Sequence, residues 1–224
     1  MDVDPRTIVI YSDIGCPWAT LAVHRLHATR ARLGLNDVVA FDHRVFALEE
    51  HNDRPTPKRV LDAEVPVVGG LEPDLGMRLW KGDASTWPVT TLLALEAVQA
   101  AKAQGLAASA ALDLALRRAF FCDSRCISLR SVVLDVAAAS AAVDIDALRD
   151  ALDDGRARRA VIEQSEGAEE AGVNGSPHLF LPDGSDAFNP GIEMHWQGEH
   201  GTGFPVIDGD DPKVYEDLLE RAAQ

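Results

Sequence analysis

The fold of this chain is decided by residues 8–19, which read IVIYSDIGCPWA. A β-branched apolar run ends in a short turn, and Cys16 then precedes a segment in which apolar or small residues recur every three to four positions. The run favours a strand, and the spacing after it favours a helix. We therefore expect a strand over residues 7–11 and a helix over residues 17–33, with Cys16 where the helix begins.

Cys16 is the candidate nucleophile. Pro17 suits the first turn of a helix, because the N–H that proline lacks would have no helical partner there. A thiol at this point faces unpaired backbone N–H groups and the positive end of the helix dipole, and both lower its pKa and favour the reactive thiolate. Ala19 stands where a two-cysteine motif would place its second thiol. The alternative is that Cys16 is a small buried hydrophobe without chemistry.

A second motif lies at residues 172–181, which read GVNGSPHLFL. It predicts a loop that leads into a short apolar strand over residues 178–182. Pro177 fits this prediction, because proline is tolerated at the first residue of a strand. A cis bond between Ser176 and Pro177 would be a specific feature of the architecture, since few X–Pro bonds are cis in folded proteins.

Together, the Cys-Pro helix and the late Gly-x-Ser-Pro strand resemble the thioredoxin fold, and more closely its DsbA-like branch. Further segments resemble the cytosolic FrnE-like group of DsbA-family oxidoreductases; they are Phe46–Glu50, Arg54–Pro57, Trp87–Thr91 and Arg117–Phe121. The resemblance covers about residues 7 to 181. It implies an α/β fold in which an all-helical domain interrupts a thioredoxin-like sheet. The expected divisions are residues 1–64 and 173–224 for the two halves of the thioredoxin-like domain, and residues 65–172 for the helical insertion.

The resemblance also implies a thiol:disulfide oxidoreductase that acts through Cys16. In thioredoxin-like proteins the residue before the cis-proline faces the active-site cysteine, so Ser176 and Pro177 are expected to shape the substrate site. The Ser176 hydroxyl is then placed to donate toward a thiolate. Pro17 and Trp18 are expected to line the same site, although Trp18 is equally suited to core packing.

Because Ala19 carries no thiol, the mixed disulfide on Cys16 must be resolved by another thiol. Glutathione or mycothiol, acting as a co-substrate rather than a tightly bound cofactor, is one candidate, and a partner protein is another. Two alternative functions stay open. One is a glutathione-dependent enzyme similar to kappa-type transferases and 2-hydroxychromene-2-carboxylate isomerases, which generally carry serine near the helix start. The other is a redox-inactive binding or chaperone-like module.

Cys122 and Cys126 form a second group of thiols within the expected insertion. Their i,i+4 spacing places both sulfurs on one face if the segment is helical, with a backbone separation of about 6 Å that a disulfide can span. Three interpretations remain: two reduced, partly buried thiols, a secondary redox pair that resolves Cys16, or part of a metal site. Zinc prefers four ligands and no histidine lies nearby, which disfavours the metal site.

The amino-acid composition argues against some classes of binding partner. The 224 residues are 46% hydrophobic and carry a formal charge of −15, which argues for a folded protein and against nucleic acid or an anionic membrane as the partner. No apolar run approaches the length of a membrane span, and the acidic first residues lack the features of a secretory signal. We therefore expect a cytoplasmic protein. The seven histidines show no metal-ligand spacing.

The remaining segments give weaker patterns. Residues 38–46 favour a second strand, which we expect to be central, and residues 49–87 an irregular connection. Residues 88–170 favour three or four helices, with breaks near residues 105, 122–127 and 143–144. A weak strand is expected within residues 187–197, a solvated loop around His195 and His200, and a closing helix over residues 210–223.

Overall fold

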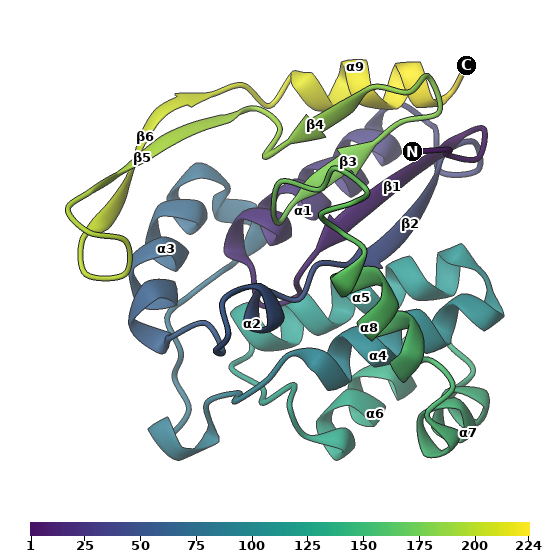
Figure 1. The fold of residues 1–224 in the computed structure, drawn as a ribbon, viewed down its shortest axis with the longest axis horizontal. Coiled ribbons are helices and arrows are strands. Elements are labelled where there is room, and N and C mark those ends of the chain that lie inside the picture. Colours follow the sequence, from purple (N-terminus) through teal and green to yellow (C-terminus); the bar gives the residue numbers. More distant parts are fainter.

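The computed structural model describes residues 1–224. A four-stranded mixed sheet lies at its centre, in the order β2-β1-β3-β4. The strands are β1 (Thr7–Ser12), β2 (Ala40–Val45), β3 (His178–Phe180) and β4 (Asp186–Phe188). β1 pairs in parallel with β2 and antiparallel with β3, so the first and last parts of the chain share one sheet (Figure 1). The predicted α/β fold is confirmed.

The expectation that the second strand is central is wrong. β2 has β1 as its one neighbour and forms an edge of the sheet. Its side chains alternate between half-buried and buried, with Phe41, His43 and Val45 turned inward. This alternation is typical of a strand that packs on one face only, and the helical layer supplies that face.

Nine α-helices surround the sheet; they are α1 (Pro17–Arg32), α2 (Leu48–His51), α3 (Lys58–Leu71), α4 (Leu92–Ala101), α5 (Leu106–Phe121), α6 (Arg130–Ala138), α7 (Ile145–Asp154), α8 (Arg158–Glu166) and α9 (Val214–Ala222). Three short 3-10 turns lie at Pro73–Leu75, Ala84–Thr86 and Lys102–Gln104. Helices α1 and α9 pack together beside the sheet, and α4 to α8 form a separate layer below it (Figure 1). Five helices therefore occupy the region for which three or four were predicted.

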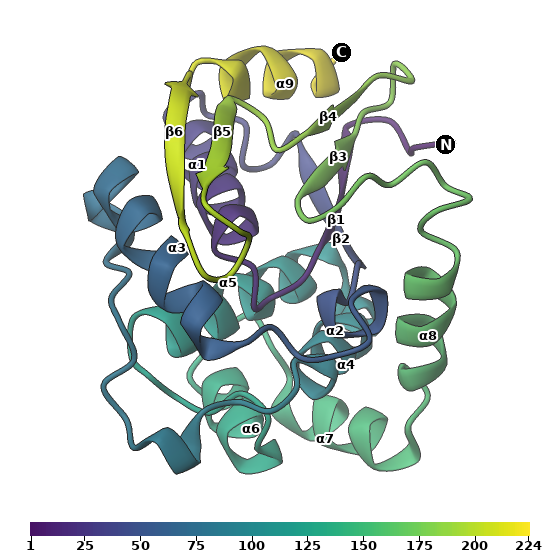
Figure 2. The same cartoon turned by 60° about the vertical axis from the view of Figure 1, so that its left-hand side comes forward.

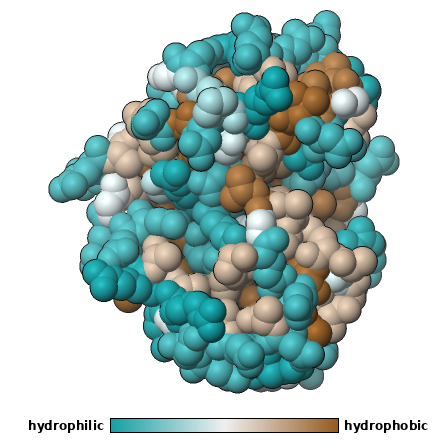
Figure 3. All heavy atoms as spheres, turned by 90° about the vertical axis from the view of Figure 1, so that its right-hand side faces the viewer, coloured by the Kyte–Doolittle hydropathy of each residue, from teal (hydrophilic) through white to brown (hydrophobic).

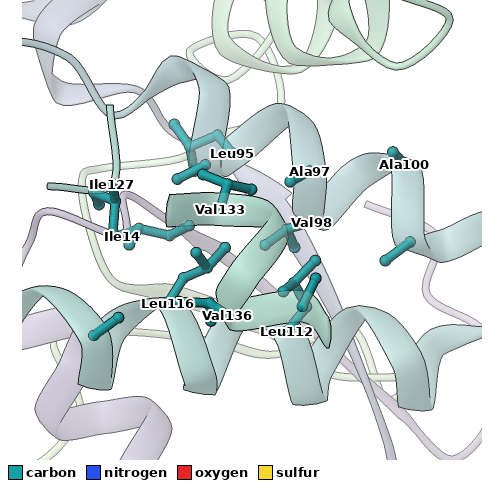
Figure 4. Packing of buried hydrophobic residues seen from close by; sticks show 14 of the residues in the cluster. Ile14, Leu95, Ala97, Val98, Ala100, Leu112, Leu116, Ile127, Val133 and Val136 are labelled. Atoms are coloured by element: carbon teal, nitrogen blue, oxygen red, sulfur yellow. The ribbon is translucent and has the colours of Figure 1, made fainter. Parts of the chain in front are cut away.

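The helical layer shares its core with the end of the sheet. The largest hydrophobic cluster joins residues of α4 to α8 to Ile14, which follows β1, and to Val45 at the end of β2. Figure 4 shows Ile14 on the side of this cluster toward Leu116, with Leu112 one turn further along α5. The turn before Cys16 is thus held between the sheet and the helices.

Helix α3 was not predicted, because residues 49–87 read as an irregular connection. Pro66 lies inside it and Gly69 and Gly70 near its end, and these residues disfavour helices. The helix forms because Val60, Leu61, Val65 and Val68 bury one face against the protein. The expected domain boundary at residues 64 and 65 falls within α3.

A two-stranded hairpin, β5 (Ile192–Gln197) and β6 (Phe204–Asp210), lies across α3 (Figure 2). The weak strand expected within residues 187–197 corresponds to β5, whereas β6 was missed. Pro205 and Gly209 are both poor strand formers, which explains the missing signal. His195 consequently belongs to a strand rather than to a loop. None of the helices has the length and apolar sequence needed to cross a membrane.

Candidate active site

Cys16 caps the N-terminus of α1, as the sequence predicted. Its Sγ accepts a hydrogen bond from the Ala19 N–H at 3.4 Å, and Pro17 occupies the first helical turn. The preceding turn is tight, because the Gly15 N–H donates to Asp13 Oδ1 at 2.7 Å. This arrangement holds the sulfur above the unpaired N–H groups of the helix.

The segment around Ser176 meets Cys16 from the far end of the chain. The Cys16 thiol donates to the Ser176 carbonyl oxygen at 3.1 Å, and the Ser176–Pro177 bond is cis. The Ser176 hydroxyl accepts from the Asp13 N–H at 2.9 Å. Residues 160 positions apart are thus brought together. The sulfur is hydrogen-bonded to the carbonyl of Ser176, and the Ser176 side chain also lies near enough to act on the pKa of the thiol.

Trp18 lies beside the thiol and is buried. It belongs to one apolar cluster with Cys16, Leu21 and Val68. Residues of the β5–β6 hairpin, including Met194, pack against the same cluster. The indole N–H donates to Glu64 Oε1 on α3 at 3.0 Å. Trp18 therefore links the active-site helix to a buried carboxyl group.

The pKa of Cys16 differs from the sequence expectation. Burial is the main cause, since the residue is 4% exposed, and the carboxylates of Glu64 and Asp13 add to it. The Ala19 N–H and the Ser176 side chain oppose this change, but the net effect raises the pKa to about 12. The predicted lowering is therefore wrong for the protein without substrate, because low polarity and negative charge outweigh the helix N-terminus. The resting sulfur is a thiol.

Glu64 is the functional candidate that the sequence did not reveal. It is 7% exposed, and burial raises its pKa to about 7, against the opposing hydrogen bond from Trp18. A carboxyl group with this pKa changes charge near neutral pH. The sequence contains one weak signal, since Glu64 lies within the largely apolar stretch of residues 60–68, which also contains Asp62.

On the other side of the turn, Arg117 on α5 binds the backbone that precedes Cys16. Its guanidinium donates to the Asp13 carbonyl oxygen at 2.9 Å and to Ser12 Oγ at 2.8 Å. It also forms a buried ion pair with Asp113, with Nε and Oδ2 2.7 Å apart. Arg117 and Asp113 are both almost fully buried. These contacts hold the turn before Cys16 in place from the side of α5.

The segments after β2 and before α4 meet beside Asp13. The Leu48 N–H and the Thr91 hydroxyl both donate to Asp13 Oδ2, at 2.8 and 3.1 Å. Glu49 accepts from the Thr90 hydroxyl at 2.6 Å and from the Thr91 N–H at 2.8 Å. Helix α2 is thereby attached to the active-site turn.

Neither Cys122 nor Cys126 belongs to the apolar cluster of Cys16, although Cys122 is hydrogen-bonded to Leu75, whose side chain does belong to it. Cys122 ends α5 and its thiol donates to the Leu75 carbonyl oxygen at 3.2 Å, whereas Cys126 lies in the connection that follows. The helix does not continue through both residues, so the i,i+4 geometry does not apply. Both thiols are reduced, and no group of potential metal ligands is found in the structure. Burial raises the pKa of Cys122.

Comparisons with known proteins agree with this geometry. Residues 7–197 match the family model of the DSBA-like thioredoxin domain. No curated protein matches the sequence.

Similar solved structures include a probable DsbA oxidoreductase from Streptomyces coelicolor, which is 22% identical, with 96% of this chain and 89% of that chain covered and a TM-score of 0.65. The cytosolic disulfide reductase DsbM from Pseudomonas aeruginosa is 18% identical, with 97% and 95% covered and a TM-score of 0.59. DsbM has also been solved with GSH; that structure is 19% identical, with 79% and 86% covered and a TM-score of 0.56. A 2-hydroxychromene-2-carboxylate isomerase is 17% identical, with 81% and 88% covered and a TM-score of 0.57. At these identities the likeness shows a shared fold.

Proposed function

The chain belongs to the DSBA-like thioredoxin domain family, and from this premise we propose that it is a thiol:disulfide oxidoreductase that works through one thiol, Cys16. The observation that carries the proposal is the position of Cys16 Sγ. It lies at the N-terminus of α1, 3.1 Å from the carbonyl oxygen that precedes the cis bond to Pro177. Ala19 provides no second thiol on the same turn, so the mixed disulfide that the reaction forms must be resolved by a thiol from outside this motif.

The exchange proceeds in two steps. The Cys16 thiol gives up its hydrogen bond to the Ser176 carbonyl oxygen and loses its proton to solvent, and the thiolate attacks one sulfur of a substrate disulfide. The new bond joins Cys16 to that sulfur, and the other sulfur leaves as a thiolate that takes up a proton. A second thiol then attacks the substrate sulfur of the mixed disulfide, which returns Cys16 to the reduced state. Over the whole cycle Cys16 returns to its starting redox state, and electrons pass only between the two substrates.

The raised pKa of Cys16 determines how this reaction depends on pH. A group with a pKa of about 12 is almost entirely protonated at neutral pH. Since the thiolate is the nucleophile, the rate of the first step should rise with pH and reach no plateau below pH 9, provided that the substrate does not change the environment of the sulfur.

The test is mixed-disulfide formation with hydroxyethyl disulfide, a small uncharged substrate. In a Cys122→Ser/Cys126→Ser background, Cys16 alone can react, so intact mass reports one adduct. We expect the adduct, with a rate that rises about tenfold per pH unit from pH 6 to 9. The matched control adds Cys16→Ser and should form none. An unreacted Cys16 at pH 9 would contradict the proposal.

We assign the protein to the FrnE-like, cytoplasmic group within this family. The four segments that resemble the group support the assignment, and DsbM, which shares the fold, is a cytosolic disulfide reductase. Glutathione or mycothiol, or a partner protein, would resolve the mixed disulfide. DsbM has been solved with GSH, which supports a low-molecular-weight thiol in this role. A secondary role for Cys122 and Cys126 would require them to approach Cys16.

One observation favours a second candidate, a glutathione-dependent isomerase or transferase. Cys16 is a protonated hydrogen-bond donor, as a serine at this position would be, and a 2-hydroxychromene-2-carboxylate isomerase shares the fold. In that case Cys16 would donate to the sulfur of bound glutathione and form no covalent bond. Two measurements separate the candidates. With oxidised glutathione, the oxidoreductase forms a mixed disulfide on Cys16 and releases one reduced glutathione, whereas the isomerase type forms no adduct. Calorimetry with reduced glutathione should show reversible binding that survives Cys16→Ser only for the isomerase type.

A further inference from the structure

A groove of about 540 Å³ lies between α2, α4 and α8, outside the Cys16 site. Residues of these three helices line it, and the helices come from different parts of the chain, as their colours in Figure 2 show. A cavity of this size is within the range of known ligand sites. The face on the right-hand side of Figure 1 carries mostly hydrophilic residues, with hydrophobic patches among them (Figure 3).

The charge of the groove is strongly one-sided. Four carboxyl groups line it, from Glu50, Glu96, Glu166 and Glu169, against one guanidinium, Arg158, and one imidazole. Glu96 is 4% exposed and pairs with Arg158, with Oε2 and Nε 3.2 Å apart. The other three glutamates form no ion pair. A bound group with positive charge would relieve the repulsion among them.

The groove also contains a polar atom without a partner. Ser165 on α8 lines the groove, is 3% exposed, and its Oγ forms no hydrogen bond. A buried hydroxyl without a partner costs free energy that a ligand hydrogen bond recovers. A hydroxyl both donates and accepts, so it matches an ammonium group or a peptide carbonyl.

Helix α2 connects the groove to the active site. Its first residue, Leu48, donates to Asp13 in the turn before Cys16 and packs against the Cys16 cluster. Glu50 lies two residues further and lines the groove. At 1.5 Å per helical residue, the groove begins within about 6 Å of the active-site turn along this helix. A polypeptide whose disulfide reaches Cys16 is long enough to enter both.

We propose that this groove binds a positively charged segment of the polypeptide substrate, with lysine or arginine side chains directed toward Glu50, Glu166 and Glu169. The apolar stems of these side chains fit the hydrophobic part of the lining, where Ile162 is 51% exposed. The inference rests on the proposed function in that the bound polypeptide carries the disulfide. It adds a preference for basic substrates.

The test uses three peptides of equal length, each with one cysteine activated as the neutral pyridyl disulfide. Three further positions carry lysine, serine or glutamate. Release of thiopyridone measures the rate of mixed-disulfide formation with Cys16 in the Cys122→Ser/Cys126→Ser background. At low ionic strength we expect the lysine peptide to react about tenfold faster than the serine peptide. Added salt should reduce this ratio toward one.

Variants in which glutamate is replaced by neutral glutamine test whether the preference for the lysine peptide arises in the groove. Glu166→Gln/Glu169→Gln should lower the lysine-to-serine ratio by about threefold and leave the rate of the serine peptide unchanged. The matched control, Asp217→Asn/Glu220→Gln, removes two exposed carboxylates from α9, away from the groove, and should leave the ratio unchanged. An equal effect of both variants, or a glutamate peptide that reacts fastest, would overturn the proposal.

A failure of the proposed function gives a different result. If no peptide releases thiopyridone, exchange at Cys16 is refuted, and binding is measured by fluorescence anisotropy with a lysine peptide that carries serine in place of cysteine. Binding that is lost in Glu166→Gln/Glu169→Gln but kept in Asp217→Asn/Glu220→Gln supports the groove. An absence of binding to the unchanged protein overturns it.

Discussion

Two buried charged side chains flank the turn that carries Cys16, and their surroundings differ. Arg117 uses its guanidinium to bind Asp113, the Asp13 carbonyl oxygen and the Ser12 hydroxyl. Glu64 has one hydrogen-bond partner, the indole N–H of Trp18, and otherwise lies among apolar residues. Both groups are less than a tenth exposed.

The difference shows that the charge of Arg117 has a structural role, whereas the charge of Glu64 can change with pH. A guanidinium keeps its charge, and Arg117 has partners on the strand, the turn and its own helix, so it fixes geometry at any working pH. Glu64 has too few partners to hold its charge, and burial raises its pKa to about 7. Its charge therefore changes near neutrality, within electrostatic reach of Cys16.

The largest effect is expected from Arg117→Met. The substitution leaves the buried carboxylate of Asp113 without its ion-pair partner and removes donors from Ser12 and the Asp13 carbonyl. Breaking a buried pair in this way costs about 3–5 kcal/mol of unfolding free energy. Urea denaturation at neutral pH measures the loss.

The matched variant is Asp113→Leu/Arg117→Met, which removes both charges together. It should recover more than half of the loss, because no uncompensated charge remains, and the rest reflects the missing donors to the turn. If the double variant is as unstable as the single one, the backbone contacts of Arg117, and not the ion pair, carry its contribution.

A smaller effect, of opposite sign, is expected from Glu64→Gln. In the folded protein the carboxyl group ionises near pH 7, and in the unfolded chain near pH 4.5, so the folded state loses stability as the pH rises between these values. Glutamine does not ionise, so it causes no such loss of stability, and its side-chain oxygen can still accept the hydrogen bond from the Trp18 indole N–H. With 1.36 kcal/mol per pKa unit, the variant should be up to about 3 kcal/mol more stable at pH 8.

The gain in stability from Glu64→Gln should disappear at pH 4, where the native carboxyl group is protonated in both states. Unfolding in urea at pH 4, 6 and 8 follows the predicted curve. A difference that does not change with pH would mean that the side chains differ in packing and that Glu64 keeps one charge state.

Local signals in the sequence were sufficient to place the two motifs in their elements. Pro17 and the apolar spacing after it indicated a helix that begins beside Cys16, and Pro177 indicated the start of a strand, which begins at His178. The fold and the contact between the two motifs were expected from the family resemblance. The direction of the pKa shift of Cys16 could not be expected, because it depends on burial by segments distant in the sequence.

The position of Glu64 shows why the direction of the Cys16 pKa shift could not be predicted from the sequence. Glu64 lies 46 residues from Trp18, on a helix whose sequence includes Pro66 and paired glycines. Its partner could be identified only after α3 was placed against α1. The hairpin that packs on the same cluster was missed for a related reason, since Pro205 weakens the strand signal of β6.

The smallest expected effect concerns the thiol itself and tests whether Glu64 controls its reactivity. The negative charge of Glu64 raises the pKa of Cys16, so Glu64→Gln should lower that pKa and increase the thiolate fraction. In the Cys122→Ser/Cys126→Ser background, alkylation of Cys16 by iodoacetamide at pH 8 should become about threefold faster. Below pH 6 the two proteins should differ little, because Glu64 is then mostly neutral. Asp62→Asn removes a half-buried carboxylate, which pairs with Lys58, from the same helix and serves as the control. A slower reaction in Glu64→Gln would instead identify Glu64 as the group that accepts the proton of Cys16.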